Sequence, residues 1–94
     1  MPSATLTVRA HKAGGYFDSL CKHFGRKVAV ERDLNNAKVN FPMGLCHMSL
    51  DDDVMRFDCS ADDAEALEAV KAIIAGHVVR YGELKNATLQ WTEE

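Results

Sequence analysis

Apolar and polar residues alternate at both ends of the chain, and this period of two is typical of a half-buried β-strand. Toward the N-terminal end the alternating apolar residues are Leu6, Val8 and Ala10. Toward the C-terminal end they are Ala87, Leu89 and Trp91. We therefore expect one strand over residues 5–10 and another over residues 87–91.

Two other segments carry apolar residues every three or four positions, which places them on one face of an α-helix. The first helix is predicted to run from Ala13 to Gly25, since a glycine is suited to end a helix. The second is predicted to begin in the acidic segment 60–65 and to end at Gly82, about 20 residues or ~30 Å later. Gly76 inside this helix is expected to permit close packing. The two apolar faces consist of Phe17, Leu20, Cys21 and Phe24, and of Leu67, Val70, Ile74, His77, Val78 and Tyr81.

Residues 28–60 are predicted to form four strands, because short turn-forming segments interrupt a continued period of two. The asparagine pair 35–36 tolerates positive φ, as a two-residue hairpin turn requires. The segment 41–44 contains a proline, which excludes positive φ there and favours a type I turn with a bulge at Gly44. The aspartate pair 52–53 is predicted to form the third turn.

The register of these strands determines which side chains are buried, because a shift of one residue would exchange the two faces of the sheet. The predicted pairs are Cys46–Cys59 and Met48–Phe57 on the apolar face, and His47–Asp58, Ser49–Arg56 and Asp33–Lys38 on the polar face. Only one face is apolar, so we expect both helices to cover that face.

The resulting order of elements is β-α-β-β-β-β-α-β. It predicts an α+β fold, a two-layer sandwich in which an antiparallel sheet carries two helices on one face. The chain has 94 residues, and no linker or repeat divides it. We therefore expect a single domain over residues 1–94.

Composition narrows the class of protein. Apolar residues make up 47% of the chain and charged residues 27%, as in an ordinary globular protein. No apolar run approaches the ~18–20 residues of a membrane span, and no signal peptide is apparent at the N-terminus. An odd number of cysteines, three, argues against a secreted disulfide framework. We expect a cytoplasmic protein that does not enter a membrane.

The charge is unevenly distributed along the chain. The net charge of −3 argues against a protein that binds nucleic acid by neutralising phosphates. Lys22, Arg26 and Lys27 nevertheless form a basic cluster at the end of the first predicted helix. This cluster is either a solvated helix end, where cations are favoured, or a site for a small anion.

The three cysteines are poor candidates for a catalytic nucleophile. A reactive thiol requires exposure and an electropositive setting, whereas Cys21, Cys46 and Cys59 all fall on predicted apolar faces. Cys21 and His23 cannot form a catalytic pair, because residues two apart on a helix point in different directions. We expect no catalytic residue, and an enzyme is the less favoured interpretation.

Two histidines are the best candidates for a site. His77 lies in the apolar face of the second predicted helix, and His23 lies near the end of the first. If the helices lie side by side, the two rings can approach one another, with Arg80 and Tyr81 nearby. The pair is either structural, each ring hydrogen-bonded to a backbone carbonyl, or part of a ligand site. His23 and His77 are weak metal candidates, because zinc needs about four ligands at a recognisable spacing. We therefore predict no metal and no cofactor.

Three segments carry a resemblance that spans the chain: YFDSLCKHFGRKVAVE, VNFPMGLCHMSLDDD and HVVRYGELKNATLQW. Together they resemble the bacterial domain-of-unknown-function family DUF2218. The matching positions are Tyr16, Leu20, Cys21 and His23, then Phe41, Pro42, Gly44 and Cys46, and finally His77, Arg80, Tyr81 and Trp91. The pair Gly14-Gly15 departs from the better helix formers of relatives.

The resemblance implies a role near iron and siderophores, because members of that family also occur attached to flavin-dependent siderophore-interacting reductases. We expect a non-enzymatic accessory or small-ligand-binding module, with such a reductase or a small anionic ligand as partner. His23, His77, Arg80 and Tyr81 are the candidate ligand-binding residues. The alternatives are a small thiol or redox protein that uses Cys21, and a homodimeric interaction module. The chain is expected to be a monomer or a homodimer.

Overall fold

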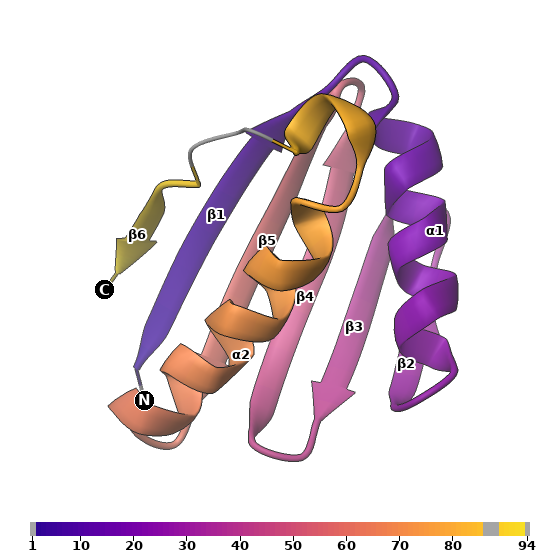
Figure 1. The fold of residues 1–94 in the computed structure, drawn as a ribbon. Helices are drawn as coiled ribbons and strands as arrows, with labels where there is room; N and C mark the ends of the chain where they lie inside the picture. The colour runs from indigo at the N-terminus through magenta and orange to yellow at the C-terminus, as the bar shows by residue number, and fades with distance from the viewer. Residues whose placement is uncertain (1, 86–88, 94) are drawn as a thin grey trace.

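The fold was analysed in a computed structural model, which describes residues 2–85 and 89–93 (Figure 1). The elements are β1 (Ser3–Arg9), α1 (Ala13–Gly25), β2 (Ala29–Arg32), β3 (Asn36–Phe41), β4 (Gly44–Asp51), β5 (Val54–Ala61), α2 (Ala64–Val78), a short 3₁₀ helix η1 (Gly82–Leu84) and β6 (Trp91–Glu93). The predicted α+β class and the predicted order of strands and helices are confirmed. The 3₁₀ helix is an addition that the sequence pattern did not indicate.

All six strands belong to one antiparallel sheet in the order β2-β3-β4-β5-β1-β6. The first strand of the chain therefore lies inside the sheet, between β5 and the last strand. Figure 1 shows both helices on the same face, with α1 over the β2 end and α2 crossing in front of β4 and β5. The prediction that both helices cover one face is confirmed.

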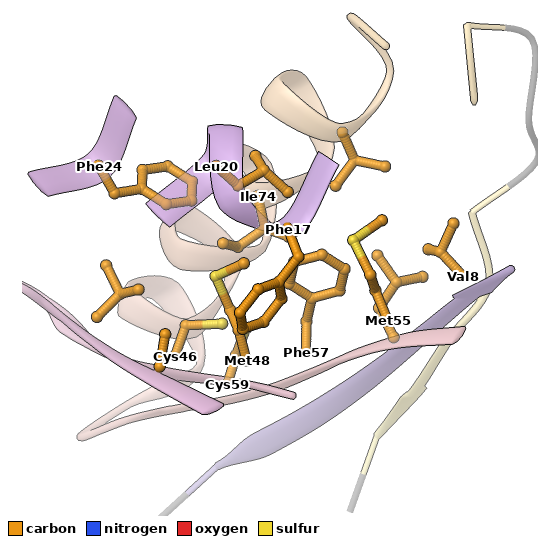
Figure 2. Packing of buried hydrophobic residues seen from close by; sticks show 14 of the residues in the cluster. Val8, Phe17, Leu20, Phe24, Cys46, Met48, Met55, Phe57, Cys59 and Ile74 are labelled. Atoms are coloured by element: carbon orange, nitrogen blue, oxygen red, sulfur yellow. The ribbon is translucent and has the colours of Figure 1, made fainter. Parts of the chain in front are cut away.

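The core lies between the helices and this face of the sheet. The largest side chains that are fully enclosed come from both helices and from β1, β3, β4 and β5: Phe17, Phe57, Leu6, Leu20, Met48, Met55, Ile74, Val39, Val70 and Val78. Figure 2 shows how Phe17, Leu20 and Phe24 of α1 project toward Cys46, Met48 and Phe57 of the sheet. The predicted apolar faces of the two helices meet in one layer.

The central hairpin has the predicted register. Cys46 faces Cys59 and Met48 faces Phe57 on the buried side, and the turn is formed by residues 52–53. On the other side His47 lies opposite Asp58 and is exposed. Asp58, however, accepts a hydrogen bond from Thr5 Oγ1 at 2.7 Å and forms its ion pair with Arg56 at 3.0 Å.

The first hairpin differs from the prediction. Asp33 does not face Lys38; Glu31 does, and their charged groups are 3.9 Å apart. The turn consists of residues 34–35, closed by a 2.8 Å hydrogen bond from the Asp33 N–H to the Asn36 carbonyl, and neither turn residue has positive φ. Because the register moves by two residues, every side chain keeps its predicted face.

The predicted end of α2 at Gly82 is wrong, because α2 ends at Val78. The N–H groups of Arg80 and Tyr81 bond to carbonyls three residues earlier, which tightens the backbone, and Tyr81 is then extended with ψ 139°. Its ring packs on Tyr16, with the ring centroids 4.8 Å apart. A contact between distant residues therefore overrides the helical periodicity that continues to Tyr81 in the sequence.

The predicted bounds of α1, Ala13 to Gly25, are confirmed, and the chain leaves the helix through Arg26 in a right-handed conformation. The expectation about Gly76 fails. Gly76 does not serve close packing, because a Cβ there would meet nothing within 4 Å.

Two expectations about strands need correction as well. Gly44 pairs with Phe41 and Ala61 in an unbroken ladder, so the predicted bulge is absent. The last strand is β6 at Trp91–Glu93, and residues 89–90, which were also predicted to be strand, are not part of it. The predicted strand positions 87 and 88 lie outside the described residues.

Candidate functional site

The structure brings His23 and His77 together where the C-terminal ends of α1 and α2 converge. Their ring centroids are 4.7 Å apart and their planes are inclined by 55°. Phe24 packs beside them, with its ring centroid 5.0 Å from that of His77. The two histidines therefore form one cluster with an aromatic residue of the core.

The hydrogen bonding of His77 determines which nitrogen is available for chemistry. Nδ1 of His77 lies 2.7 Å from the carbonyl oxygen of Ile73, one turn earlier in α2. A carbonyl oxygen can only accept, so Nδ1 carries the proton that is donated. In a neutral ring Nε2 is then the acceptor, and it points away from the helix backbone that binds Nδ1. This bond is also the contact expected of a structural histidine. Nδ1 of His77 therefore has a structural role, and Nε2 can bind another group.

A pocket of about 270 Å³ opens beside this pair. Its lining comes from the end of α1, the turn between β3 and β4, and α2: His23, Phe24, Lys27, Val28, Phe41, Pro42, Met43, Ile73 and His77. Phe24 and Phe41 meet edge to face, with centroids 5.5 Å apart, and form an aromatic wall. Most of the lining side chains are apolar, and the polar ones are His23, His77 and Lys27.

The electrostatic setting of His23 opposes its protonation. Partial desolvation lowers the pKa of His23 below its usual 6.5, and the neighbouring His77 and the cations Lys27, Arg26 and Arg80 lower it further. His23 is therefore a neutral hydrogen-bonding group near pH 7.

Tyr81 and Arg80 approach the cluster from the other side. Tyr81 lines a second hollow together with Ser19, Lys22, His23 and Arg26. Burial raises the pKa of the Tyr81 phenol. Arg80 is exposed and does not line either hollow, although its charge acts on His23. Of the four candidate residues, three thus line a hollow and Arg80 flanks it.

Several residues of the pocket were not identified from the sequence. Phe41 and Pro42 appear in the motif that carries the family resemblance, which is a signal for them. Met43 and Ile73 carried no signal, because Met43 is a turn residue and Ile73 lies one position from the buried face of α2. Tyr16 was named only in the motif, yet it holds Tyr81 in place.

The thiols are all enclosed. Cys21 is 5% exposed, and burial raises the pKa of its thiol. Cys46 and Cys59 face each other across β4 and β5, and the hydrogen bond with Cys59, together with burial, raises the pKa of the Cys46 thiol. These are the surroundings of unreactive cysteines, and they speak against a redox role for Cys21.

No group of three or more His, Cys, Asp or Glu side chains is arranged to hold a metal ion within residues 2–85 and 89–93. His23 and His77 alone supply two of the ligands that a zinc site needs. In the same described residues, no helix is long and apolar enough to cross a membrane.

Comparison with known proteins places the chain in a family. The family model described as "Uncharacterized protein conserved in bacteria (DUF2218)" matches residues 5–92. The chain belongs to the DUF2218 family. It is also similar to the NMR structure of PA4090 from Pseudomonas aeruginosa, with 25% identity and a TM-score of 0.78 over 98% of this chain and 96% of that one. Among curated proteins, none matches the chain.

Proposed function

We propose that this DUF2218 protein is a non-enzymatic module that binds one small aromatic ligand in the pocket between α1 and α2. The observation that carries the proposal is the apolar pocket of about 270 Å³ with two imidazoles in its wall. An apolar cavity of about 150 Å³ is enough to bind benzene. The pocket therefore has room for one ring with substituents. It is smaller than the sites of roughly 300–1,000 Å³ that hold drug-sized ligands.

The lining suits an aromatic ring with a hydroxyl group. Phe24 and Phe41 offer a face and an edge to a third ring. The Nε2 atom of His77 can accept a hydrogen bond, because Nδ1 is bound to the Ile73 carbonyl. A few fixed polar groups in an apolar wall are what orient a small ligand in a site.

We further propose that this binding serves iron or siderophore metabolism, with a siderophore-interacting reductase as a partner protein. The support is the family's occurrence with such reductases, which the resemblance implies. A catechol ring with paired hydroxyls, as found in many siderophores, has the size and the chemistry of the proposed ligand. Ferric iron alone is not expected to bind, because His23 and His77 supply only two ligands.

Isothermal titration calorimetry of the chain with catechol, phenol, ferric iron and zinc tests the proposal. We expect catechol and phenol to bind and the two metal ions alone not to bind. Met43→Trp places a large ring at the mouth of the pocket and should weaken phenol and catechol binding at least about tenfold, a change of ~1.4 kcal/mol. The double variant His23→Ala/His77→Ala should weaken catechol more than phenol, because catechol has a second hydroxyl.

Leu34→Trp is the matched control, since Leu34 is a turn residue that is 80% exposed and remote from the pocket lining. It should leave binding unchanged. Absence of any aromatic binding to the wild type, or equal binding to wild type and Met43→Trp, would refute the proposal and leave the two histidines structural. The reductase partner is tested separately by NMR. Addition of a siderophore reductase should shift or broaden the amide resonances of this chain if the two proteins bind.

A further inference from the structure

A second hollow adjoins the pocket and has a different character. It has a volume of about 360 Å³, and its lining side chains are Ser19, Lys22, His23, Arg26 and Tyr81. His23 lines both hollows, so the two lie next to each other. We refer to the second hollow as the basic groove. A ligand that occupies both hollows would lie against His23.

Every side chain that lines the basic groove can donate a hydrogen bond. Ser19 and Tyr81 have hydroxyl groups, Lys22 and Arg26 have cationic N–H groups, and the ring of His23 has one N–H when neutral. Tyr81 is held in position by its stack on Tyr16. Several donor groups around one hollow suit an oxyanion with several acceptor oxygens.

Positive charge gathers around the groove without equivalent negative charge. Within the described residues, Arg26, Lys27 and Arg80 take part in none of the ion pairs. Lys22 does pair with Asp18 at 3.0 Å, but Asp18 also binds Arg32 at 2.6 Å. One carboxylate is thus shared by two cations.

Together these cations make the electrostatic potential at the groove positive. Lys27, Arg26 and Arg80 all oppose the protonation of His23, which indicates a positive local potential on a chain whose net charge is −3.

We propose that the basic groove binds the phosphate group of an aromatic phosphate ester whose ring occupies the apolar pocket. This inference rests on the proposed function and names its ligand class. Phosphate is favoured over carboxylate because a dianion matches two lining cations and two flanking ones, and because it has more oxygens that can accept hydrogen bonds from the lining residues. Arg26 is the principal anion-binding residue, since its planar guanidinium can bind two phosphate oxygens at once.

The test compares phenyl phosphate, phenol, benzoate and inorganic phosphate by calorimetry at constant ionic strength. We expect phenyl phosphate to bind the wild type at least about tenfold more tightly than phenol. Arg26→Gln should remove most of that advantage and leave phenol binding unchanged, because Arg26 does not line the pocket. Arg9→Gln is the matched control, since Arg9 is an exposed arginine on β1 far from the groove, and it should change nothing.

Each outcome bears on the inference in a definite way. Equal binding of phenol and phenyl phosphate, or an equal effect of Arg26→Gln and Arg9→Gln, overturns the anion site while the aromatic pocket stands. An equal advantage for benzoate overturns the assignment to phosphate. Inorganic phosphate bound by the wild type and lost in Arg26→Gln, with no binding of phenol, supports the groove and refutes the proposed function instead.

Discussion

The carboxylate of Glu83 accepts hydrogen bonds from the backbone N–H groups of His11 and Lys12, at 2.8 and 2.9 Å. Lys12 occupies the N-cap position of α1, and no side chain caps this helix from within. A residue of the short helix after α2 therefore fixes the start of α1, where negative charge is favoured by the helix dipole. The same contact helps to hold Tyr81 beside Tyr16.

Glu83→Gln should therefore destabilise the protein in a pH-dependent way. The hydrogen bonds from the backbone of His11 and Lys12 lower the pKa of the Glu83 carboxyl below its usual 4.5. A carboxylate with a lowered pKa in the folded state stabilises the fold above the pKa of the unfolded chain and loses this effect as the pH falls through the folded value. Urea unfolding should show the variant less stable than wild type at pH 7 and the difference shrinking toward pH 3.

Glu31→Gln is the control for this experiment, because Glu31 lies exposed on an edge strand. Its effect should stay within about 0.5 kcal/mol, as for surface changes in general. A loss for Glu83→Gln that is the same at pH 7 and pH 3 would show that charge plays no part in the contact.

His23 should also lose its contribution to stability as the pH falls, but over a higher pH range than Glu83. Its pKa is lowered in the folded state, first by desolvation and then by His77 and the cations around it, so protonation favours the unfolded chain. Stability from this group is complete above the unfolded value near 6.5 and declines as the pH falls toward the folded value. In urea unfolding between pH 7.5 and 5, His23→Gln should lose less stability than wild type.

The proton resonances of the imidazole rings give a direct check on this expectation. His23 should titrate below 6.5, and its titration should move upward when phenyl phosphate is present. His47→Gln serves as a control for removing a histidine in general, because His47 is exposed on the uncovered face of the sheet. Titration of His23 at or above 6.5 in the free protein would contradict the electrostatic description of the site.

Gly44 is predicted to be essential for packing. A Cβ at this position would lie 2.6 Å from the Ser60 carbonyl oxygen and 2.9 Å from Cγ2 of Val70. The carbonyl belongs to the backbone of the paired strand and cannot move without disturbing the ladder. Gly44→Ala should lower the free energy of unfolding by about 1–3 kcal/mol, as overpacking does in a close-packed interior.

The same substitution at Gly76 provides the contrast. A Cβ there would meet nothing within 4 Å, and the residue lies in the interior of α2. Gly76→Ala should raise the free energy of unfolding by about 0.5–1 kcal/mol, because alanine is the better helix former. Equal effects of the two substitutions in chemical denaturation would show that the close contact at Gly44 relaxes freely.

All three thiols are predicted to be unreactive in the folded protein. Cys21, Cys46 and Cys59 are each at most 5% exposed, and burial raises the pKa of the Cys21 thiol away from the reactive thiolate form. Ellman's reagent should therefore label none of them rapidly in buffer and all three in urea. Rapid labelling that Cys21→Ser abolishes would restore the redox interpretation of this protein.

The strengths and failures of the sequence pattern have physical causes. The alternation of apolar and polar residues predicted the buried side chains of the central hairpin correctly. Side chains alternate strictly between the two faces, so a shift by one residue would expose Met48 and Phe57. The observed register of the first hairpin differs from the predicted one by two residues. A difference of two keeps every side chain on its predicted face, and an asparagine-rich segment can form more than one type of turn. Periodicity could not end α2 at Val78, because the decisive contact, Tyr81 on Tyr16, joins distant parts of the chain.

The candidate site was predictable only in part, for a related reason. His23 and His77 could be selected because a polar residue at or near an apolar face is unusual. Their distance depended on how the helices lie across the sheet, which no local pattern encodes. Met43 and Ile73 line the pocket through the same tertiary arrangement, and nothing in their immediate neighbours in the sequence distinguishes them.

The place of β1 within the sheet has a consequence for the order in which the chain can fold. Ser3 pairs with Ser60 and Ala4 with Glu93, so both neighbours of the first strand are synthesised long after it. As the chain leaves the ribosome, the meander of β2, β3 and β4 can form from nearby residues, whereas β1, with one apolar face, has no strand to pair with yet. Closing such distant pairs is slow compared with forming local ones. Insertion of β1 between β5 and β6 should therefore be the late step of folding, and the stage at which the nascent protein most needs protection from association.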